Sequence, residues 1–275
     1  MLKIFVDSGS SIKQDEKEKY GVEILPLRYL MGDNEYEDGV DLTIDEFYTL
    51  LIEKKLFPKT SLPYLVEFET TVNNLTKNGD NVIIISISSG ISGTYSAFKT
   101  MFEGNEKVAV IDSLTAVGGI KIIVNEINKY KDKPLDFIVD KVNALIPRIK
   151  VVAIPETLDY LLKGGRLSKK DWFLGSMLNI KPIISLPGGN VRVLAKKIGL
   201  KAAMKYITQS LVDDGCDENY PIVPSYTYTD TNLKALIKMT DAKYHKQMIE
   251  FDNLDPAIAC HWGPNAFGFI YVTKE

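Results

Sequence analysis

The fold is decided by the stretch "NVIIISISSGISGT", residues 81–94, in which an unbroken apolar run leads into a loop of small hydroxyl residues and glycines. Two further stretches share this design: "LKIFVDSGSS", residues 2–11, and "KVAVIDSLTAVGG", residues 107–119. An uninterrupted apolar run is typical of a strand that is buried on both faces, and each loop leads into a helix-like segment. The pattern predicts a parallel sheet with crossover helices, whose loops at the carboxyl ends of the strands line a ligand site.

The segment between the first two of these units contains a hairpin and two helix starts. "VEILPLRYLMGDNEYEDGVD", residues 22–41, predicts a hairpin that turns at residues 32–34, and "TIDE", residues 43–46, is a capping box that opens a helix. In "PKTSLP", residues 58–63, Pro63 fits an early position of the helix predicted over residues 64–75. Thr60 and Ser61 are therefore expected near a helix N-terminus.

A second lobe is predicted after about residue 155, where the composition changes. "TLDYLLKGGR", residues 157–166, reads as a helix with a glycine stop, and "KPIISLPGGNVRVLAKK", residues 181–197, reads as a hairpin. Helices over residues 200–211 and 231–240 and strands over residues 220–228 and 266–272 complete a mixed pattern. We therefore predict an α/β lobe with a mostly parallel sheet at residues 1–155 and an α+β lobe at residues 156–275.

Composition narrows the range of partners. The chain has 275 residues, 33 Lys and Arg against 36 Asp and Glu, and a sequence pI near 5.6. Such a chain has no overall basic field to attract nucleic acid or an anionic membrane. No apolar segment approaches the length of a bilayer span, and the first apolar run is too short for a secretory signal, so a cytoplasmic location without membrane insertion is expected. The spacing of Cys216 and Cys260 indicates neither a disulfide framework nor a zinc site, and no cofactor is predicted.

The hydroxyl-rich loop of residues 86–94 is a candidate anion site. Ser92, Gly93 and Thr94 stand where a strand ends and a helix begins, so amide groups at the positive end of the helix dipole face a ligand. Residues 86–98 contain no Lys or Arg and lack the spacing of a phosphate-binding loop, which favours a monoanionic carboxylate over phosphate. The alternative is that these hydroxyls only cap their own helix.

Arg166 and His261 are the other candidate site residues, each with a structural alternative. Arg166 follows two glycines at the predicted end of a helix, where it either pairs with the helix dipole or supplies a permanent positive charge to the site. His261 lies in "HWGPNAFG" and either accepts a local structural partner or serves the site.

A serine hydrolase is the alternative of a different class. Ser92, an aspartate at 112 or 159, and His261 follow the chain order of an α/β-hydrolase triad, but the sequence around Ser92 lacks the G-x-S-x-G elbow. A carrier of another small carboxylic acid is the third possibility.

Six motifs together resemble the DegV family over nearly the whole chain. They are "PKTSLP", "SISSGISGTYSA", "VIDSLTAVGG", "TLDYLLKGGRLSK", "LNIKPIISL" and "HWGPNAFG". The resemblance implies a two-lobed fold that holds a long-chain fatty acid between an α/β lobe and an α+β lobe, with the carboxylate at the serine loop. Its better-understood members are similar to the fatty-acid-binding subunits of bacterial fatty acid kinase, non-catalytic proteins that present the acid to a separate ATP-dependent kinase for acyl-phosphate formation.

The same resemblance implies roles for particular residues. Thr60 and Ser92 would hydrogen-bond the carboxylate, Arg166 and His261 would join the surrounding polar network, and three neighbours would assist, namely Ser61, Gly93 and Thr94. The chain departs from the family at Ile198 and Leu200, where many members carry arginines that could meet the kinase.

Overall fold

A computed structural model of the protein describes residues 1–172, 179–250 and 252–275. Contacts among the Cα positions divide these residues into two compact units. Unit 1 comprises residues 1–147 and 255–257, and unit 2 comprises residues 148–254 and 258–275. Leu178, the first residue of the "LNIKPIISL" motif, lies outside the described residues.

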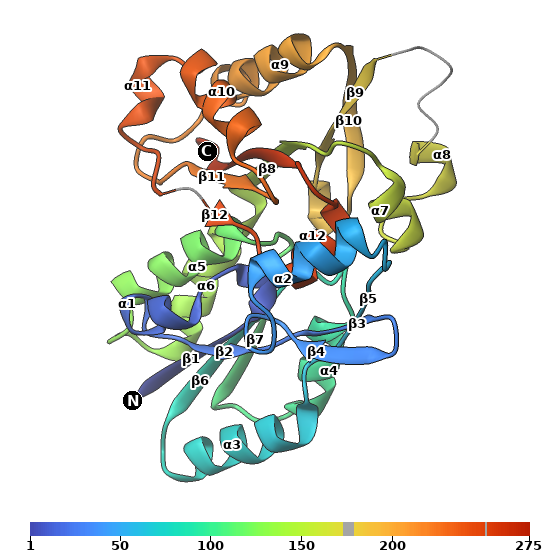
Figure 1. The fold of residues 1–275 in the computed structure, drawn as a ribbon. Coiled ribbons are helices and arrows are strands. Elements are labelled where there is room, and N and C mark those ends of the chain that lie inside the picture. Colours follow the sequence, from blue (N-terminus) through green and yellow to red (C-terminus); the bar gives the residue numbers. More distant parts are fainter. Residues whose placement is uncertain (173–178, 251) are drawn as a thin grey trace. The chain divides into compact units, whose positions relative to one another are not determined.

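Unit 1 is built on a four-stranded parallel sheet with the order β2-β1-β6-β7 (Figure 1). Its strands are β1 (Leu2–Asp7), β2 (Glu23–Leu25), β6 (Asn81–Ser86) and β7 (Val108–Asp112). The three apolar runs of the sequence form β1, β6 and β7, which confirms the predicted parallel sheet. Because parallel strands place their carboxyl ends at one edge, the three hydroxyl-rich loops gather there.

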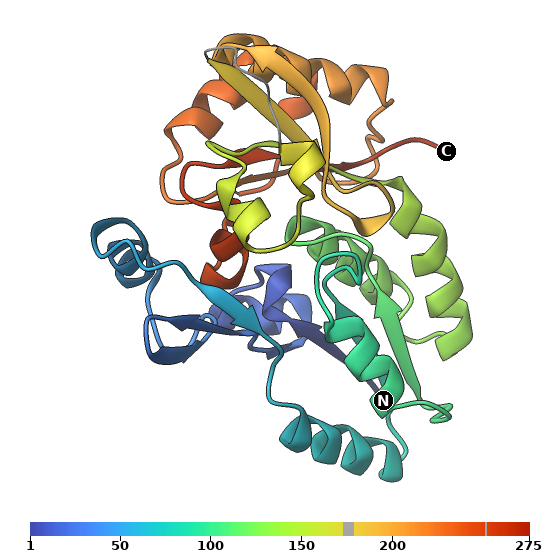
Figure 2. The ribbon, with the colours of Figure 1, turned by 90° about the vertical axis from the view of Figure 1, so that its right-hand side faces the viewer.

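Helices cover both faces of this sheet (Figures 1 and 2). The covering helices are α3 (Leu65–Lys77), α4 (Thr94–Met101), α5 (Gly118–Lys129) and α6 (Leu135–Leu145). The helix α1 (Lys17–Tyr20) lies against α5, and α2 (Ile44–Tyr48) contacts the Tyr29 ring through Phe47. One core cluster joins Phe5 and Ile84 of the sheet to Phe68 of α3 and Phe98 of α4. Phe68 contacts Phe5 and Phe98 through rings whose centroids are 5.2 and 5.1 Å away, so this layer is a packed aromatic cluster.

A small antiparallel sheet, β4-β3-β5, completes unit 1. Its strands are β3 (Arg28–Met31), β4 (Asn34–Glu37) and β5 (Lys59–Ser61). Met31 pairs with Asn34, so the predicted hairpin is confirmed and its turn is formed by two residues. The predicted capping box is also present, because Thr43 and Glu46 exchange hydrogen bonds at the start of α2.

Unit 2 contains a six-stranded mixed sheet with the order β10-β9-β8-β13-β11-β12. The strands are β8 (Ile149–Ile154), β9 (Ile180–Ser185), β10 (Arg192–Ile198), β11 (Val223–Tyr226), β12 (Asp252–Asn253) and β13 (Phe267–Val272). The predicted hairpin is β9 and β10, whose antiparallel register includes a bulge between Val193 and Ala195. The strand β8, which lies just ahead of the predicted lobe boundary, pairs with β9 and β13 of unit 2.

The helices of unit 2 are α7 (Asp159–Lys163), α8 (Lys169–Trp172), α9 (Leu200–Asp213), α10 (Thr231–Met239), α11 (Ala242–His245) and α12 (Pro256–Trp262), whose first two residues cluster with unit 1. Short helical turns are η1 (Ser8–Ser10), η2 (Gln14–Glu16), η3 (Thr49–Glu53), η4 (Ile146–Arg148) and η5 (Pro187–Gly189). Ile207 of α9 and Leu233 of α10 pack with Val152 and Phe269 of the sheet in one buried cluster. This arrangement is the predicted α+β class.

Within the described ranges, no helix has the length and apolarity needed to cross a membrane. The same residues contain no group of three or more His, Cys, Asp or Glu side chains placed to hold a metal ion.

Candidate functional site

The loop that follows β1 is tied to the serine loop by Asp7, the last residue of β1. Asp7 is fully buried, and its carboxylate accepts hydrogen bonds from the amide of Gly9 at 3.0 Å and from the amide of Ile87 at 2.8 Å. Burial raises the pKa of Asp7 to about 7, although the two amide hydrogen bonds act in the opposite direction. One carboxylate thus fixes two loops at the carboxyl edge of the sheet.

Asp112, the last residue of β7, has the same role for the next pair of loops. Its Oδ1 accepts hydrogen bonds from the amides of Ser89 at 3.0 Å and Leu114 at 3.1 Å. Backbone hydrogen bonds reinforce this connection, because the amide of Ser88 donates to the carbonyl of Thr115 at 2.9 Å. The three loops are therefore cross-linked into one structure.

Asp7 is not among the residues predicted from the sequence, although the sequence contains a signal for it. Two of the three apolar runs end in aspartate, as "IFVD" and "AVID", directly before a hydroxyl-rich loop. An acceptor at that position can hold the amides of a neighbouring loop.

Ser92, Gly93 and Thr94 occupy the predicted junction between the serine loop and α4. Gly93 is the residue before the helix, and Thr94 is its first residue. The Oγ of Ser92 lies 2.8 Å from the Oγ1 of Thr94 and accepts a hydrogen bond from the Thr94 amide at 3.3 Å. Ser92 is only half-buried, whereas Thr94 is fully buried. Ser92 therefore satisfies the first amide of the helix, and its half-buried hydroxyl can still meet a ligand.

Thr60 and Ser61 lie on strand β5 and not beside a helix N-terminus, because α3 begins only at Leu65. Thr60 pairs with Tyr29 of β3, a partner distant in sequence that the local pattern did not reveal. Thr60 is half-buried, whereas Ser61 is exposed and its hydroxyl lies 3.4 Å from a carboxylate oxygen of Glu35.

The segment after β5 lies beside the serine turn. A Cβ atom added at Gly93 would meet the Cδ2 of Leu62 at 3.9 Å. The "PKTSLP" and "SISSGISGT" motifs of unit 1 are therefore neighbours, although α3 and β6 separate them in the chain.

Three hydroxyls near this edge of the sheet are buried and have no hydrogen-bond partner among the described residues. They belong to Ser11, Ser86 and Thr115, one from each of the three loop regions. An unsatisfied buried hydroxyl costs roughly 1–3 kcal/mol, so a water molecule or a polar ligand group is expected to satisfy such groups.

In unit 2, Arg166 and His261 both contact Gly164, which follows the last residue of α7. Arg166 donates a hydrogen bond from Nη1 to the Gly164 carbonyl at 2.5 Å, as the structural alternative for this residue predicts. The His261 ring packs so closely on Gly164 that an added Cβ would lie 2.2 Å from its Nδ1. Burial and the charge of Arg166 lower the pKa of His261 to about 3, so the imidazole is neutral at physiological pH.

The residues of the hydrolase alternative have other partners. The Ser92 hydroxyl is paired with the Thr94 hydroxyl, and the Oδ1 of Asp112 accepts two loop amides. The side chain of Asp159, the other candidate acid, accepts a hydrogen bond from the Trp172 indole at 2.8 Å.

The fold and its hydroxyl-lined loops define an α/β protein with a candidate site for a small polar or anionic group. Comparison with known proteins gives the family. The protein-family model described as "Uncharacterised protein, DegV family" matches residues 1–274 of this chain. A DegV domain-containing protein of Clostridium acetobutylicum is 32% identical over 284 aligned residues, which cover 99% of each chain. This chain belongs to the DegV family.

Solved structures share the fold over the full length. A DegV family protein from Thermus thermophilus, described for its fatty acid binding, is 25% identical, with a TM-score of 0.86 and 99% of each chain covered. A fatty acid binding DegV family protein from Streptococcus agalactiae is 24% identical, with a TM-score of 0.90, and covers 100% of this chain and 99% of its own.

Proposed function

We propose that this protein binds a long-chain fatty acid without chemically changing it. The observation that carries the proposal is the cross-linked serine loop, which offers the half-buried Ser92 hydroxyl at the start of a helix and contains no Lys or Arg over residues 86–98. Membership of a family with fatty-acid-binding members supports the same ligand.

The chemistry of this loop suits a carboxylate. A monoanion is stabilised by two or three hydrogen bonds from hydroxyls and amides, together with the positive end of the dipole of α4. A doubly charged phosphate would need a cation that the loop lacks. Thr60 and Ser92 hold the carboxylate in this proposal, and Ser61, Gly93 and Thr94 assist. From the family resemblance alone we assign Arg166 and His261 to the same network.

The apolar tail supplies most of the affinity. An acyl chain with about fifteen methylene groups has a gross transfer free energy of roughly 12 kcal/mol, at about 0.8 kcal/mol per methylene, before the cost of association is subtracted. The hydroxyl loop orients the head group, whereas the tail determines how tightly the acid is held.

We further propose that the bound acid is presented to a separate ATP-dependent kinase. The region in question is the end of β10, where Ile198 is 62% exposed. By the family resemblance, many members carry an arginine at this position. The local positive charge is carried instead by Lys196, Lys197 and Lys201. Mixing the protein and its acid with a kinase subunit and ATP tests this step, and the expected product is an acyl phosphate.

The first experiment is native mass spectrometry of the purified protein, followed by organic extraction of whatever it holds. About one long-chain fatty acid per chain is expected. A protein that is empty and also ignores added oleate or palmitate would overturn the ligand.

The role of the hydroxyls is tested by titrating palmitate into variants. Ser92→Ala and Thr60→Ala together are expected to weaken binding by roughly 1–3 kcal/mol for each hydrogen bond to the charged group. Ser96→Ala is the matched control, because Ser96 is an exposed serine of α4 that follows the junction of residues 92–94. Unchanged affinity in the double variant would exclude these hydroxyls from the site. Labelling of Ser92 by a fluorophosphonate probe, with ester turnover, would favour the hydrolase alternative.

A further inference from the structure

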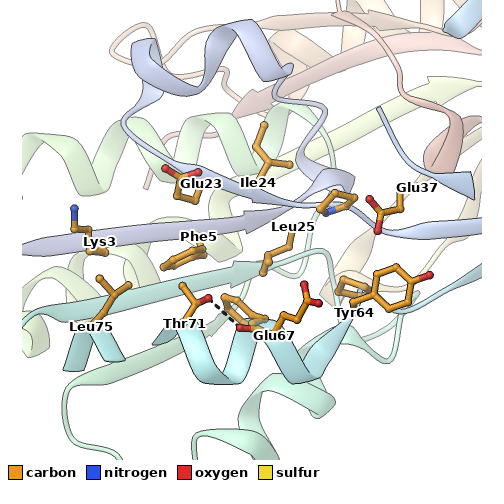
Figure 3. A pocket seen from close by; sticks show the side chains of 13 residues that line it. Lys3, Phe5, Glu23, Ile24, Leu25, Glu37, Tyr64, Glu67, Thr71 and Leu75 are labelled. Carbon is orange, nitrogen blue, oxygen red and sulfur yellow. Dashed lines mark hydrogen bonds between the residues drawn. The ribbon is translucent and has the colours of Figure 1, made fainter. Parts of the chain in front are cut away.

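Unit 1 contains a groove that the proposed acid site does not use. It has a volume of about 540 Å³ and lies between the edge of the parallel sheet and α3 (Figure 3). Its lining comes from β1, β2, the end of β4 and α3. Neither Thr60 nor any residue of the serine loop lines it. The volume falls within the range typical of small-molecule sites.

The groove exists because β2 is an edge strand that no helix covers completely. In the sheet order β2-β1-β6-β7, α3 packs against Phe5 of β1 and against β6 through Phe68. Leu25 of β2 and Leu75 of α3 are only half-buried at the margin of this cluster. The floor of the groove is therefore apolar and held by rings that are fixed in the core.

The charges along the groove are separated. Lys3 and Leu75 lie at one end, and Glu37 and Tyr64 lie at the other, with Glu67 on the α3 side (Figure 3). Among the described residues, neither Glu37 nor Glu67 forms an ion pair. This end of the groove therefore presents two carboxylates beside an apolar floor.

Two of the neighbouring cations already have an acidic partner, whereas Lys3 lies at the far end of the groove. Lys17 forms an ion pair of 2.5 Å with Glu23, the third glutamate of the lining. Arg28 stacks over the Tyr64 ring at 4.2 Å from its centroid, and its guanidinium is bound to Glu35 at 3.0 Å. Arg28 is the cross-strand partner of Glu37 but forms its ion pair with Glu35, so Glu37 and Glu67 each leave a carboxylate at this end, which disfavours a fatty acid there.

We propose that this groove binds a small organic cation with an apolar body, such as an aryl- or alkylamine. The ammonium group lies between Glu37 and Glu67, and the apolar body covers Phe5, Leu25 and Phe68. An ammonium near two carboxylates gains charge-assisted hydrogen bonds, while the body removes apolar surface from water. The ligand differs in charge from the acid of the serine loop, so the two sites are chemically distinct.

The test compares three molecules with one body and different heads: 4-phenylbutylamine, 4-phenylbutanol and 4-phenylbutyrate. Binding is followed by amide NMR shifts of ¹⁵N-labelled protein, with residues 23–25 and 64–75 as reporters. The amine is expected to bind in the millimolar range, more tightly than the alcohol, and the butyrate is expected not to perturb these residues. High salt is expected to weaken the amine alone.

Variants of α3 decide whether charge is responsible. Glu67→Gln is expected to weaken the amine by up to about five-fold, the usual range for an exposed ion pair, and Glu67→Lys to abolish its preference over the alcohol. Glu69→Gln is the matched control, because Glu69 is an exposed glutamate of the same helix outside the groove. Palmitate affinity is expected to stay unchanged in all three variants, which separates this site from the acid site.

Equal binding of the three molecules, shifts confined to other residues, or no effect of Glu67→Lys would overturn the proposal. Preferential binding of the butyrate in the groove would identify it as part of the acid site. Binding of the peptide acetyl-Lys-Phe-Lys-amide without binding of the amine would replace the small cation by a basic protein segment.

Discussion

The contact between Gly164 and His261 predicts whether the substitution Gly164→Ala stabilises or destabilises the protein. Gly164 has a φ of −71°, a backbone conformation that alanine adopts without strain. In open space, Gly164→Ala would stabilise the protein by about 0.4–1 kcal/mol, because alanine lowers the entropy of the unfolded chain. Here the new Cβ would lie 2.2 Å from the Nδ1 of His261 and 2.9 Å from the carbonyl oxygen of Tyr160.

Both of these distances are shorter than real Cβ contacts allow, so the His261 ring must move. We expect Gly164→Ala to lower the free energy of unfolding by about 1–3 kcal/mol, the usual cost of overpacking. If His261 serves the carboxylate as proposed, palmitate affinity falls by about ten-fold or more, because a hydrogen bond to a charged group is lost.

Urea denaturation and calorimetric titration with palmitate measure the two effects. Gly165→Ala is the control, since Gly165 has a φ of +75° and no atom within 4 Å of an added Cβ. It should lose about 1 kcal/mol through backbone strain and bind palmitate normally. A Gly164→Ala protein that is as stable as the wild type would refute the packing argument. One that is destabilised but binds normally would remove only His261 from the acid site.

Three further predictions concern ionisable groups whose pKa is shifted by burial. The folded-state pKa of Asp7 is about 7, above its ordinary 3.8, so folding favours the protonated side chain. The resulting contribution to the free energy of unfolding is present below pH 4 and is lost as the pH rises through 7. Asp7→Asn offers one acceptor oxygen to two amides and should therefore cost more stability at pH 5 than at pH 9. An equal loss of stability at both pH values in urea denaturation would contradict the raised pKa. Burial and the neighbouring Asp255 raise the pKa of Asp38 to about 8, so Asp38→Asn should destabilise the protein less at pH 9 than at pH 5 in the same assay. His261, with a pKa near 3, stays neutral down to low pH, so its ring resonances should not shift between pH 8 and 5 in NMR spectra; a midpoint near 6.5 would show that the ring is solvated.

The local sequence patterns determined most of the secondary structure. The apolar runs before the hydroxyl loops predicted β1, β6 and β7, and the capping box at Thr43 predicted the start of α2. The junction at Ser92 was predictable for the same reason, because the end of a buried strand and the first turn of a helix are both encoded by adjacent residues.

The tertiary structure decided what depends on partners that are distant in the chain. Thr60 lies on a strand because β3 pairs with it, and no pattern within "PKTSLP" encodes that pairing. The hydrogen bond from the Ile87 amide to Asp7 and the packing of His261 on Gly164 likewise join remote segments. A single sequence encodes the local backbone preference of each segment and the spacing of its buried residues. The position of a side chain in a site depends instead on how separate segments pack. The residue types of the proposed acid site were therefore readable from the sequence, but the carboxylates that fix its loops and the acidic groove beside α3 emerged only from the folded chain.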